Sequence, residues 1–237
     1  ANTRPPDQFR YELSNLNEQS VGLQREISSQ QTILGGLAKL EDEIKPIAEN
    51  PENAELVRSS LERASKILKT SKFEGREVLT SSPHKSSNPN IEPVTISDPP
   101  KIGTYSVSIL GKVDNSSLSF TLDVSDMLNQ KRRITTAFSP ATGIIEGVEL
   151  YFEEIEGQAK ADISIKDTEK SGFAIPDFTQ SLSRIKERSS SPEQLGREAD
   201  QSLRKIQTTR NGVESSLKQK TVEFQAIATA RENIKAS

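Results

Sequence analysis

The chain has 237 residues, of which 32% are hydrophobic and 5% aromatic, with no Trp and no Cys. This apolar content is well below that of a compact globule, so the composition favours a thin, elongated bundle of solvated helices. The net charge of −3 arises from 31 basic and 34 acidic residues that are interspersed, which disfavours a nucleic-acid partner. The lack of Cys excludes disulfides and thiol catalysis, and no apolar run approaches the roughly 18 residues of a membrane span.

Two long segments at the ends of the chain carry apolar residues spaced by three, four or seven positions, so that all fall on the alternating three- and four-residue steps of a coiled-coil seam. The first seam consists of Leu13, Leu16, Leu23, Ile27, Leu34, Leu37 and Ile44. The second consists of Leu203, Ile206, Val213, Leu217, Phe224, Ile227 and Ile234. Each seam needs an apolar partner, and we expect the two segments to lie side by side as one rod.

The first helix is predicted from about Gln8 to Glu49, with Pro46 ending or kinking it near Lys45. Asn50 is the expected N-cap of a second, antiparallel helix, and Pro51 suits its first position. Gly75 is the expected left-handed residue that closes this second helix.

Residues 81–101 hold many Pro and Ser and are predicted to be a linker. Short alternating runs over 102–170 then predict a β-rich module of four strands, with a hairpin turn at Asp114-Asn115. A second hairpin is expected between 148–152 and 161–165, and a short helix over 125–133.

Helical character resumes near Asp177, and Ser191 followed by Pro192 marks the start of the last long helix. Arg210, Lys220 and Arg231 occupy positions in its apolar seam, where polar residues set the register at a cost in stability. The predicted fold class is therefore α+β. Residues 1–80 and 171–237 form the two halves of the rod, 81–101 are a linker and 102–170 are an inserted β-rich domain.

Four stretches resemble the bacterial flagellin family. In the first, Phe9, Leu13 and Leu16 fall where the family has its RF…I…GL pattern. Residues 27–37, ISSQQTILGGL, resemble its IS-x-x-QT-x-x-GAL stretch; 70–79, TSKFEGREVL, resemble TQFNGKKLL; and 230–234, ARENI, resemble ARSRI. The positions singled out in these motifs are Gln31, Thr32, Gly35, Leu37, Phe73, Gly75, Ala230, Arg231 and Ile234. The resemblance covers about residues 8–80 and 192–235 and leaves the middle unmatched.

The chain also departs from the flagellin pattern. Residues 40–46 read LEDEIKP where the family has LQRVREL, so recognition by an animal toll-like receptor is not implied. The family's GA-x-x-N segment is absent near Asn211.

The resemblance implies a secreted structural subunit of the extracellular flagellar filament, whose terminal polymerisation helices this stretch lacks. It implies homo-oligomerisation and contact with other flagellar axial proteins in the full-length form, a monomer for this stretch, and no nucleic-acid or membrane partner. The alternative within the family is the hook–filament junction, or hook-associated, protein. An alternative from a different functional class is that the chain is a surface-adhesion or glycan-binding module.

Catalysis is not expected. His84 is the single His and stands in a Ser- and Pro-rich stretch, and Glu153, Glu154 and Glu156 fit a solvated strand face better than an acid–base pair. The sequence contains no Gly-rich phosphate loop or nucleophile motif. We therefore predict no catalytic residue, no cofactor and no metal.

Overall fold

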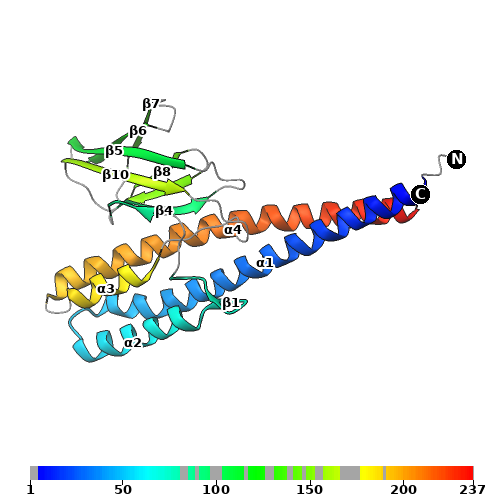
Figure 1. The fold of residues 1–237 in the computed structure, drawn as a ribbon. Helices are drawn as coiled ribbons and strands as arrows, with labels where there is room; N and C mark the ends of the chain where they lie inside the picture. Colours follow the sequence, from blue (N-terminus) through cyan, green and yellow to red (C-terminus); the bar gives the residue numbers. More distant parts are fainter. Residues whose placement is uncertain are drawn as a thin grey trace.

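The computed structural model describes residues 5–80, 85–88, 91–96, 103–114, 117–125, 131–137, 141–145, 148–152, 157–165, 177–188 and 191–236. Two long helices, α1 (Pro6–Glu49) and α4 (Pro192–Ala236), run antiparallel, so that the N- and C-terminal ends lie together at one end of the rod (Figure 1). The shorter helices α2 (Ala54–Thr70) and α3 (Thr179–Glu187) flank the other end. The predicted rod of two distant segments is confirmed.

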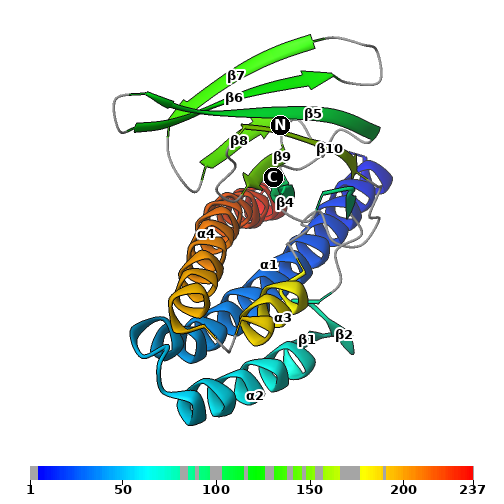
Figure 2. The ribbon, with the colours of Figure 1, turned by 90° about the vertical axis from the view of Figure 1, so that its left-hand side faces the viewer.

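The rod has two parts of different thickness. In the base, residues 31–49 of α1 and 192–215 of α4 pack with α2 and α3 (Figure 2). In the stalk, residues 6–30 of α1 and 216–236 of α4 pack on each other without α2 or α3, and the hairpin after α2 touches α1 at Arg25. The hydrophobic core of the rod lies in the base, and its buried members are Ile33, Leu37, Leu40, Ile44, Ile47, Val57, Ala64, Leu68, Leu79, Phe178, Leu182, Ile185, Leu195, Ala199, Ile206 and Val213.

Two local predictions in the first half are corrected. Helix α1 continues through Pro46 to Glu49, because the only hydrogen bond that Pro46 removes would end on the carbonyl of exposed Asp42, which water can satisfy. The N-cap of α2 is Asn53 and not Asn50: its side chain accepts a hydrogen bond from the Leu56 amide at 3.2 Å. Asn50 closes a turn instead, with its carbonyl oxygen 3.2 Å from the Asn53 amide.

A two-residue hairpin follows α2 directly. Strands β1 (Lys72–Phe73) and β2 (Arg76–Glu77) pair antiparallel, and the turn residues Glu74 and Gly75 have φ of 50° and 78°. Positive φ at both central positions defines a type I′ turn. Gly75 therefore has the predicted left-handed conformation, but α2 ends at Thr70, and the glycine serves a hairpin and not a helix cap.

The chain passes close to α1 on both sides of this hairpin. Gly36 is buried there, and a Cβ added to it would lie 2.8 Å from the Ser71 Oγ and 2.9 Å from the Leu79 Cδ1. Gly35, on the neighbouring exposed face, has nothing within 4 Å of such an atom. The missing side chain of Gly36 thus makes room for the segment that leaves the rod.

The β region contains two antiparallel sheets. One has the order β3 (Lys85–Ser86), β10 (Gly157–Ile165), β5 (Gly103–Asp114), β6 (Ser117–Ser125) and β7 (Lys131–Ala137). The other has the order β4 (Ile91–Ile96), β9 (Val148–Phe152) and β8 (Ala141–Ile145). In β5 the described residues alternate as predicted, since Val107 and Ile109 are buried whereas Ser106 and Leu110 are exposed.

The pairing of these strands confirms one hairpin and overturns other expectations. Strands β5 and β6 form the predicted hairpin, but Asp114 pairs with Ser117 and therefore belongs to β5 and not to the turn. Strands β9 and β10 lie in different sheets and do not form the second predicted hairpin. The stretch 81–101 contains β3 and β4, so it is not a plain linker, and the described ends of 125–133 belong to β6 and β7 and not to a helix. Because strand partners are chosen over long sequence distances, turn signals such as Gly157 misled these predictions.

The β region lies beside α4, with β4 next to the helix, and not beyond the end of the rod (Figure 1). The reason is where the chain leaves and returns. Buried Leu79 and buried Phe178 are joined by a hydrogen bond from the Phe178 amide to the Leu79 carbonyl oxygen at 3.0 Å. Both crossings therefore pass through one point on the side of the base.

Substitution of the two neighbouring glycines is expected to have opposite effects. Gly35→Ala should raise the free energy of unfolding by about 0.5–1 kcal/mol, because alanine restricts the unfolded chain and meets no neighbour. Gly36→Ala gains the same helix propensity, but its Cβ pushes Ser71 and Leu79 away from α1, which should lower the free energy of unfolding by about 1–3 kcal/mol. Urea unfolding of both variants measures this difference, and equal stabilisation by both would contradict the close contact at Gly36.

We propose that the rod is an autonomous unit and that the β region is an insertion into it. Replacing residues 81–176 by a short Gly/Ser linker should leave a helical rod that melts cooperatively, because Leu79 and Phe178 are already hydrogen-bonded. Circular dichroism of the shortened chain tests this proposal. Loss of helicity would show that the β region is needed to hold the rod together.

Candidate assembly surface: the two-helix stalk

The described residues offer little for small-molecule chemistry. They contain no group of three or more His, Asp or Glu side chains placed to hold a metal ion. Within the same ranges, no helix is long and apolar enough to cross a membrane. His84 and Glu153, Glu154 and Glu156 lie outside the described residues. The candidate functional surface is therefore sought on the rod.

The stalk is the part of the rod with the least buried interior. All its residues are described, and only Leu23, Gln30 and Lys220 are buried. Two of these three are polar, whereas the base buries a continuous apolar cluster. The inward-facing residues of the stalk are otherwise half-buried, because two helices alone cannot enclose the residues between them.

A cluster of polar side chains spans the stalk where it meets the base, and we call Glu26, Gln30, Ser216 and Lys220 the polar layer. The Gln30 Nε2 donates a hydrogen bond to the Ser216 Oγ at 2.9 Å. The Lys220 Nζ lies 3.2 Å from the Glu26 Oε2 and 4.0 Å from the Glu223 Oε2. The Gln30 Oε1 is buried and accepts no hydrogen bond.

Two further ion pairs lie near the polar layer. In the base, Arg210 on α4 pairs with Glu41 on α1. On the outside, Arg25 pairs through two nitrogens with Glu74 in the hairpin turn, with Nε donating to Oε1 at 2.7 Å. The hydrogen bond and the charge of Glu74 raise the pKa of Arg25 above its usual value. Both members of the Arg25 pair remain about half exposed, so its effect on stability is small.

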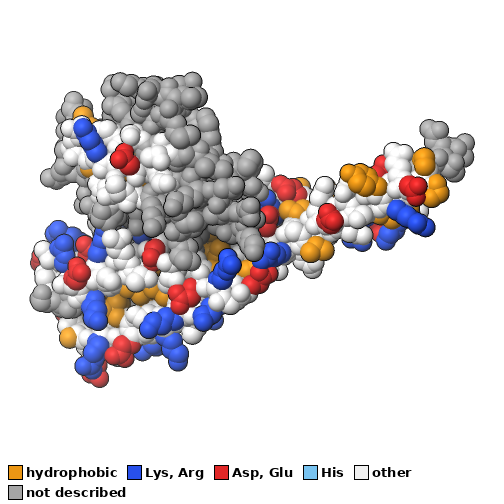
Figure 3. Space-filling view, viewed as in Figure 1, with side chains coloured by type: hydrophobic (Ala, Val, Ile, Leu, Met, Phe, Trp, Pro, Cys, Tyr) orange, Lys and Arg blue, Asp and Glu red, His pale blue; other side chains and the backbone are white. Residues whose placement is uncertain are grey.

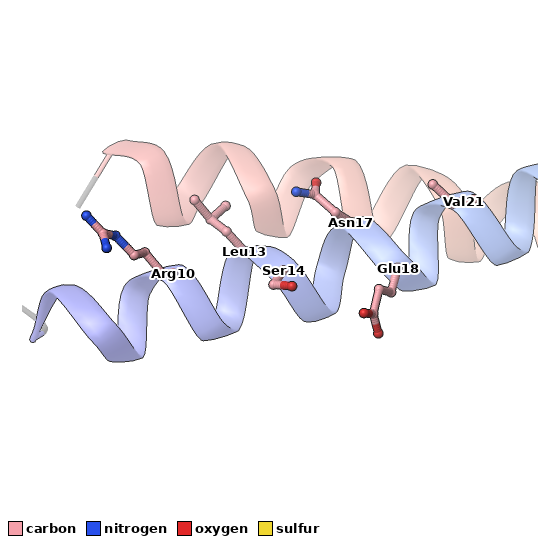
Figure 4. Close-up of a pocket in the computed structure, with 6 residues that line it drawn as sticks. All are labelled: Arg10, Leu13, Ser14, Asn17, Glu18 and Val21. Atoms are coloured by element: carbon pink, nitrogen blue, oxygen red, sulfur yellow. The ribbon is translucent and has the colours of Figure 1, made fainter.

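The stalk surface carries isolated apolar side chains and shallow depressions. Tyr11, Val21 and Val222 are 68%, 66% and 64% exposed, and hydrophobic atoms are scattered along the thin part of the molecule in Figure 3. One depression runs along α1; Figure 4 shows Leu13 and Asn17 directed toward the opposite helix and Glu18 away from it. Its lining residues are Arg10, Leu13, Ser14, Asn17, Glu18 and Val21.

A second depression bridges the two helices near the chain ends, and its lining includes Asn15 and Asn233. Both depressions are open to the surface. They suit contact with another polypeptide better than enclosure of a small ligand.

None of the predicted seam residues is exposed in the structure. Those that are buried are Leu23, Leu37, Ile44, Ile206 and Val213. Those that are half-buried are Leu13, Leu16, Ile27, Leu34, Leu203, Leu217, Phe224, Ile227 and Ile234. Any role for them in assembly stays a prediction.

The family-motif residues do not gather into one site. Leu37 is buried; Thr32, Phe73, Ala230, Arg231 and Ile234 are half-buried; and Gln31, Gly35 and Gly75 are exposed. The motif at 27–37 lies near the junction of stalk and base, that at 70–79 forms the hairpin beside α1, and that at 230–234 lies near the end of the stalk. Their common feature is that all belong to the rod.

Sequence reasoning identified Lys220 and Arg210 as polar seam positions but missed their partners Glu26 and Glu41. It also missed the hydrogen bond between Gln30 and Ser216. It also missed Lys205, which is buried with its Nζ 5.5 Å from the centre of the Phe178 ring and 3.4 Å from the Ser181 Oγ. Lys205 directly precedes the seam residue Ile206, a signal that the position could face the core. That signal does not reveal which aromatic ring covers it.

Comparison with known proteins gives similar solved structures only, since no family model and no curated protein matches the chain. The crystal structure of flagellar hook associated protein-3 from Legionella pneumophila is 9% identical with a TM-score of 0.41, covering 97% of this chain and 92% of that one. The flagellar junction protein FlgL from Legionella pneumophila is 8% identical with a TM-score of 0.37, covering 94% and 96%.

FlgL from Xanthomonas campestris is 13% identical with a TM-score of 0.33, covering 97% of this chain and 96% of that one. The TM-scores of these three structures lie below 0.5. At this level the likeness assigns no function to the chain.

Neighbouring residues of α1 provide a test of the polar layer. Glu26→Ala should lower the free energy of unfolding by about 1–3 kcal/mol, because the buried ammonium of Lys220 loses its closer carboxylate. Arg25→Ala is the matched control, and it should change the stability little because its ion pair is exposed. Chemical denaturation of both variants distinguishes them, and a larger loss for Arg25→Ala would contradict this account of the layer.

Proposed function

We propose that the chain is a structural subunit of the axial assembly of the bacterial flagellum. The observation that carries this proposal is the position of the flagellin-like stretches. Residues 8–80 and 192–235 are separated in the sequence by the unmatched middle, yet they form one antiparallel rod. A shared rod explains why the resemblance occurs at both ends of the chain and not between them.

The proposed mechanism is packing and not catalysis. Identical elongated subunits that contact one another head to tail, without closing, generate a helical assembly. The half-buried stalk supplies surface for such contacts, and the β region beside α4 supplies a separate outward face. We place the protein outside the cell, in contact with other axial proteins, and we expect this 237-residue chain by itself to be a monomer.

Of the two family roles, we propose the hook–filament junction rather than the filament subunit, which the sequence first suggested. The chain lacks two flagellin stretches, namely the arginine-containing segment expected at 40–46 and the segment expected near Asn211. Within the first of these segments, residues 40–46, Glu41 forms an ion pair with Arg210 across the two long helices. The names of the similar solved structures agree with the junction role, although their likeness does not carry it.

The location of the protein in intact flagella tests both levels of this proposal. Gold-labelled antibodies raised against this chain should mark a single narrow band where the hook meets the filament. Label along the whole filament would support the filament subunit and overturn the junction role. Flagella without any label would contradict an axial role altogether. The glycan-binding alternative stays a prediction, testable by a glycan array with the intact chain.

A further inference from the structure

We propose that the polar layer of Glu26, Gln30, Ser216 and Lys220 fixes the register of the stalk and keeps it two-stranded. This function is separate from the proposed flagellar role, because it concerns how one chain selects a single pairing of its own helices. Its basis is the placement of buried polar groups at the point where the stalk leaves the covered base.

The polar layer lowers the stability of a stalk that buries few residues. Gln30 is 4% exposed and Lys220 is 8% exposed, so both polar groups are removed from water. The Gln30 Oε1 has no hydrogen-bond partner, and a buried acceptor without a partner destabilises the folded state. Apolar residues at these positions would bury more hydrophobic surface without that penalty. Stability alone therefore does not account for the layer.

The apolar seam by itself does not define one register. A slide of α4 by one heptad brings Leu217 or Arg231 to the position of Phe224, so apolar contact is preserved in the direction that brings Leu217. The same slide places Glu26 opposite Val213 or Ile227, in place of Lys220. It also places Ser216 opposite Leu23 or Leu37, in place of Gln30. Of these three registers, the observed one alone pairs the members of the polar layer with one another.

The stalk of a second chain is an alternative partner for the seam. Tyr11, Val21 and Val222 are exposed, and neither α2 nor α3 covers the half-buried seam of the stalk. An entirely apolar seam would attract the stalk of a second chain, because burial between three or four helices is more complete than between two. Single polar positions in coiled-coil seams are known to restrict the number of strands at a cost in stability.

The test replaces the layer by apolar residues and reads the register with cysteines. The quadruple variant carries Glu26→Leu, Gln30→Leu, Ser216→Ala and Lys220→Leu. Because the chain has no Cys, introduced thiols are the only ones present. Asn15→Cys with Asn233→Cys reports the observed register, since both residues line one depression, and Asn15→Cys with Ala226→Cys reports a slide of one heptad.

In the otherwise unaltered chain, a short bifunctional cross-linker should join 15 to 233 but not 15 to 226, and light scattering should give the mass of one chain. The quadruple variant should melt at a higher temperature. It should either gain the 15–226 cross-link or approach the mass of two or more chains. A quadruple variant that stays monomeric and links only 15 to 233 overturns the proposal.

A control variant and a milder variant keep the test decisive. Glu41→Leu with Arg210→Leu removes a polar pair from the base, where α2 and α3 restrict the helices, and should leave both cross-linking and mass unchanged. If this control changes register or mass as the quadruple variant does, the special role of the layer is refuted. Should the quadruple variant not fold, Glu26→Gln with Lys220→Met removes only the charges, and unchanged cross-linking and mass in this variant then count against the proposal.

Discussion

Gln30 and Ser216 are 186 residues apart in the chain, and their hydrogen bond lies within the contact between α1 and α4 that holds the molecule together. Burial of the two apolar seams supplies the driving force for this contact, and every other element is arranged around it. Helices α2 and α3 cover its base, whereas the β region leaves and returns beside Leu79 and Phe178. A contact between such distant segments closes a long loop, which predicts slower folding than a bundle of neighbouring helices shows.

The strength of the rod changes along its length. The base has a continuous apolar core, and the tight fit at Gly36 adds to it, so this end should open only with global unfolding. The stalk buries few residues, and two of them, Gln30 and Lys220, are polar. Such a division suits the axial role proposed above, in which neighbouring subunits would complete the remaining surface of the slender stalk.

The sequence contains enough information to predict the rod, because a three- and four-residue period extends over six turns or more in both seams, from Leu13 to Ile44 and from Leu203 to Ile234. The start of α4 at Pro192 and the hairpin between β5 and β6 follow from local signals as well. Other features could not be predicted because they depend on segments distant in sequence. These are the strand partners of β9, the close packing around Gly36 and the ion-pair partner of Lys220. The N-cap of α2 shows a different limit of sequence-based prediction. Asn50 and Asn53 are equally suitable capping residues, and the turn between them determines that Asn53 caps the helix.

Pulsed electron–electron double resonance between spin labels on introduced cysteines tests the antiparallel rod most directly. Labels at Asn15→Cys and Asn233→Cys should give a short, narrow distance, because both positions line one depression. Labels at Asn15→Cys and Gln194→Cys should lie more than about 50 Å apart, since 39 helical residues rise about 1.5 Å each. Similar distances for the two pairs, or a broad distribution for the first, would contradict the side-by-side packing of the chain ends.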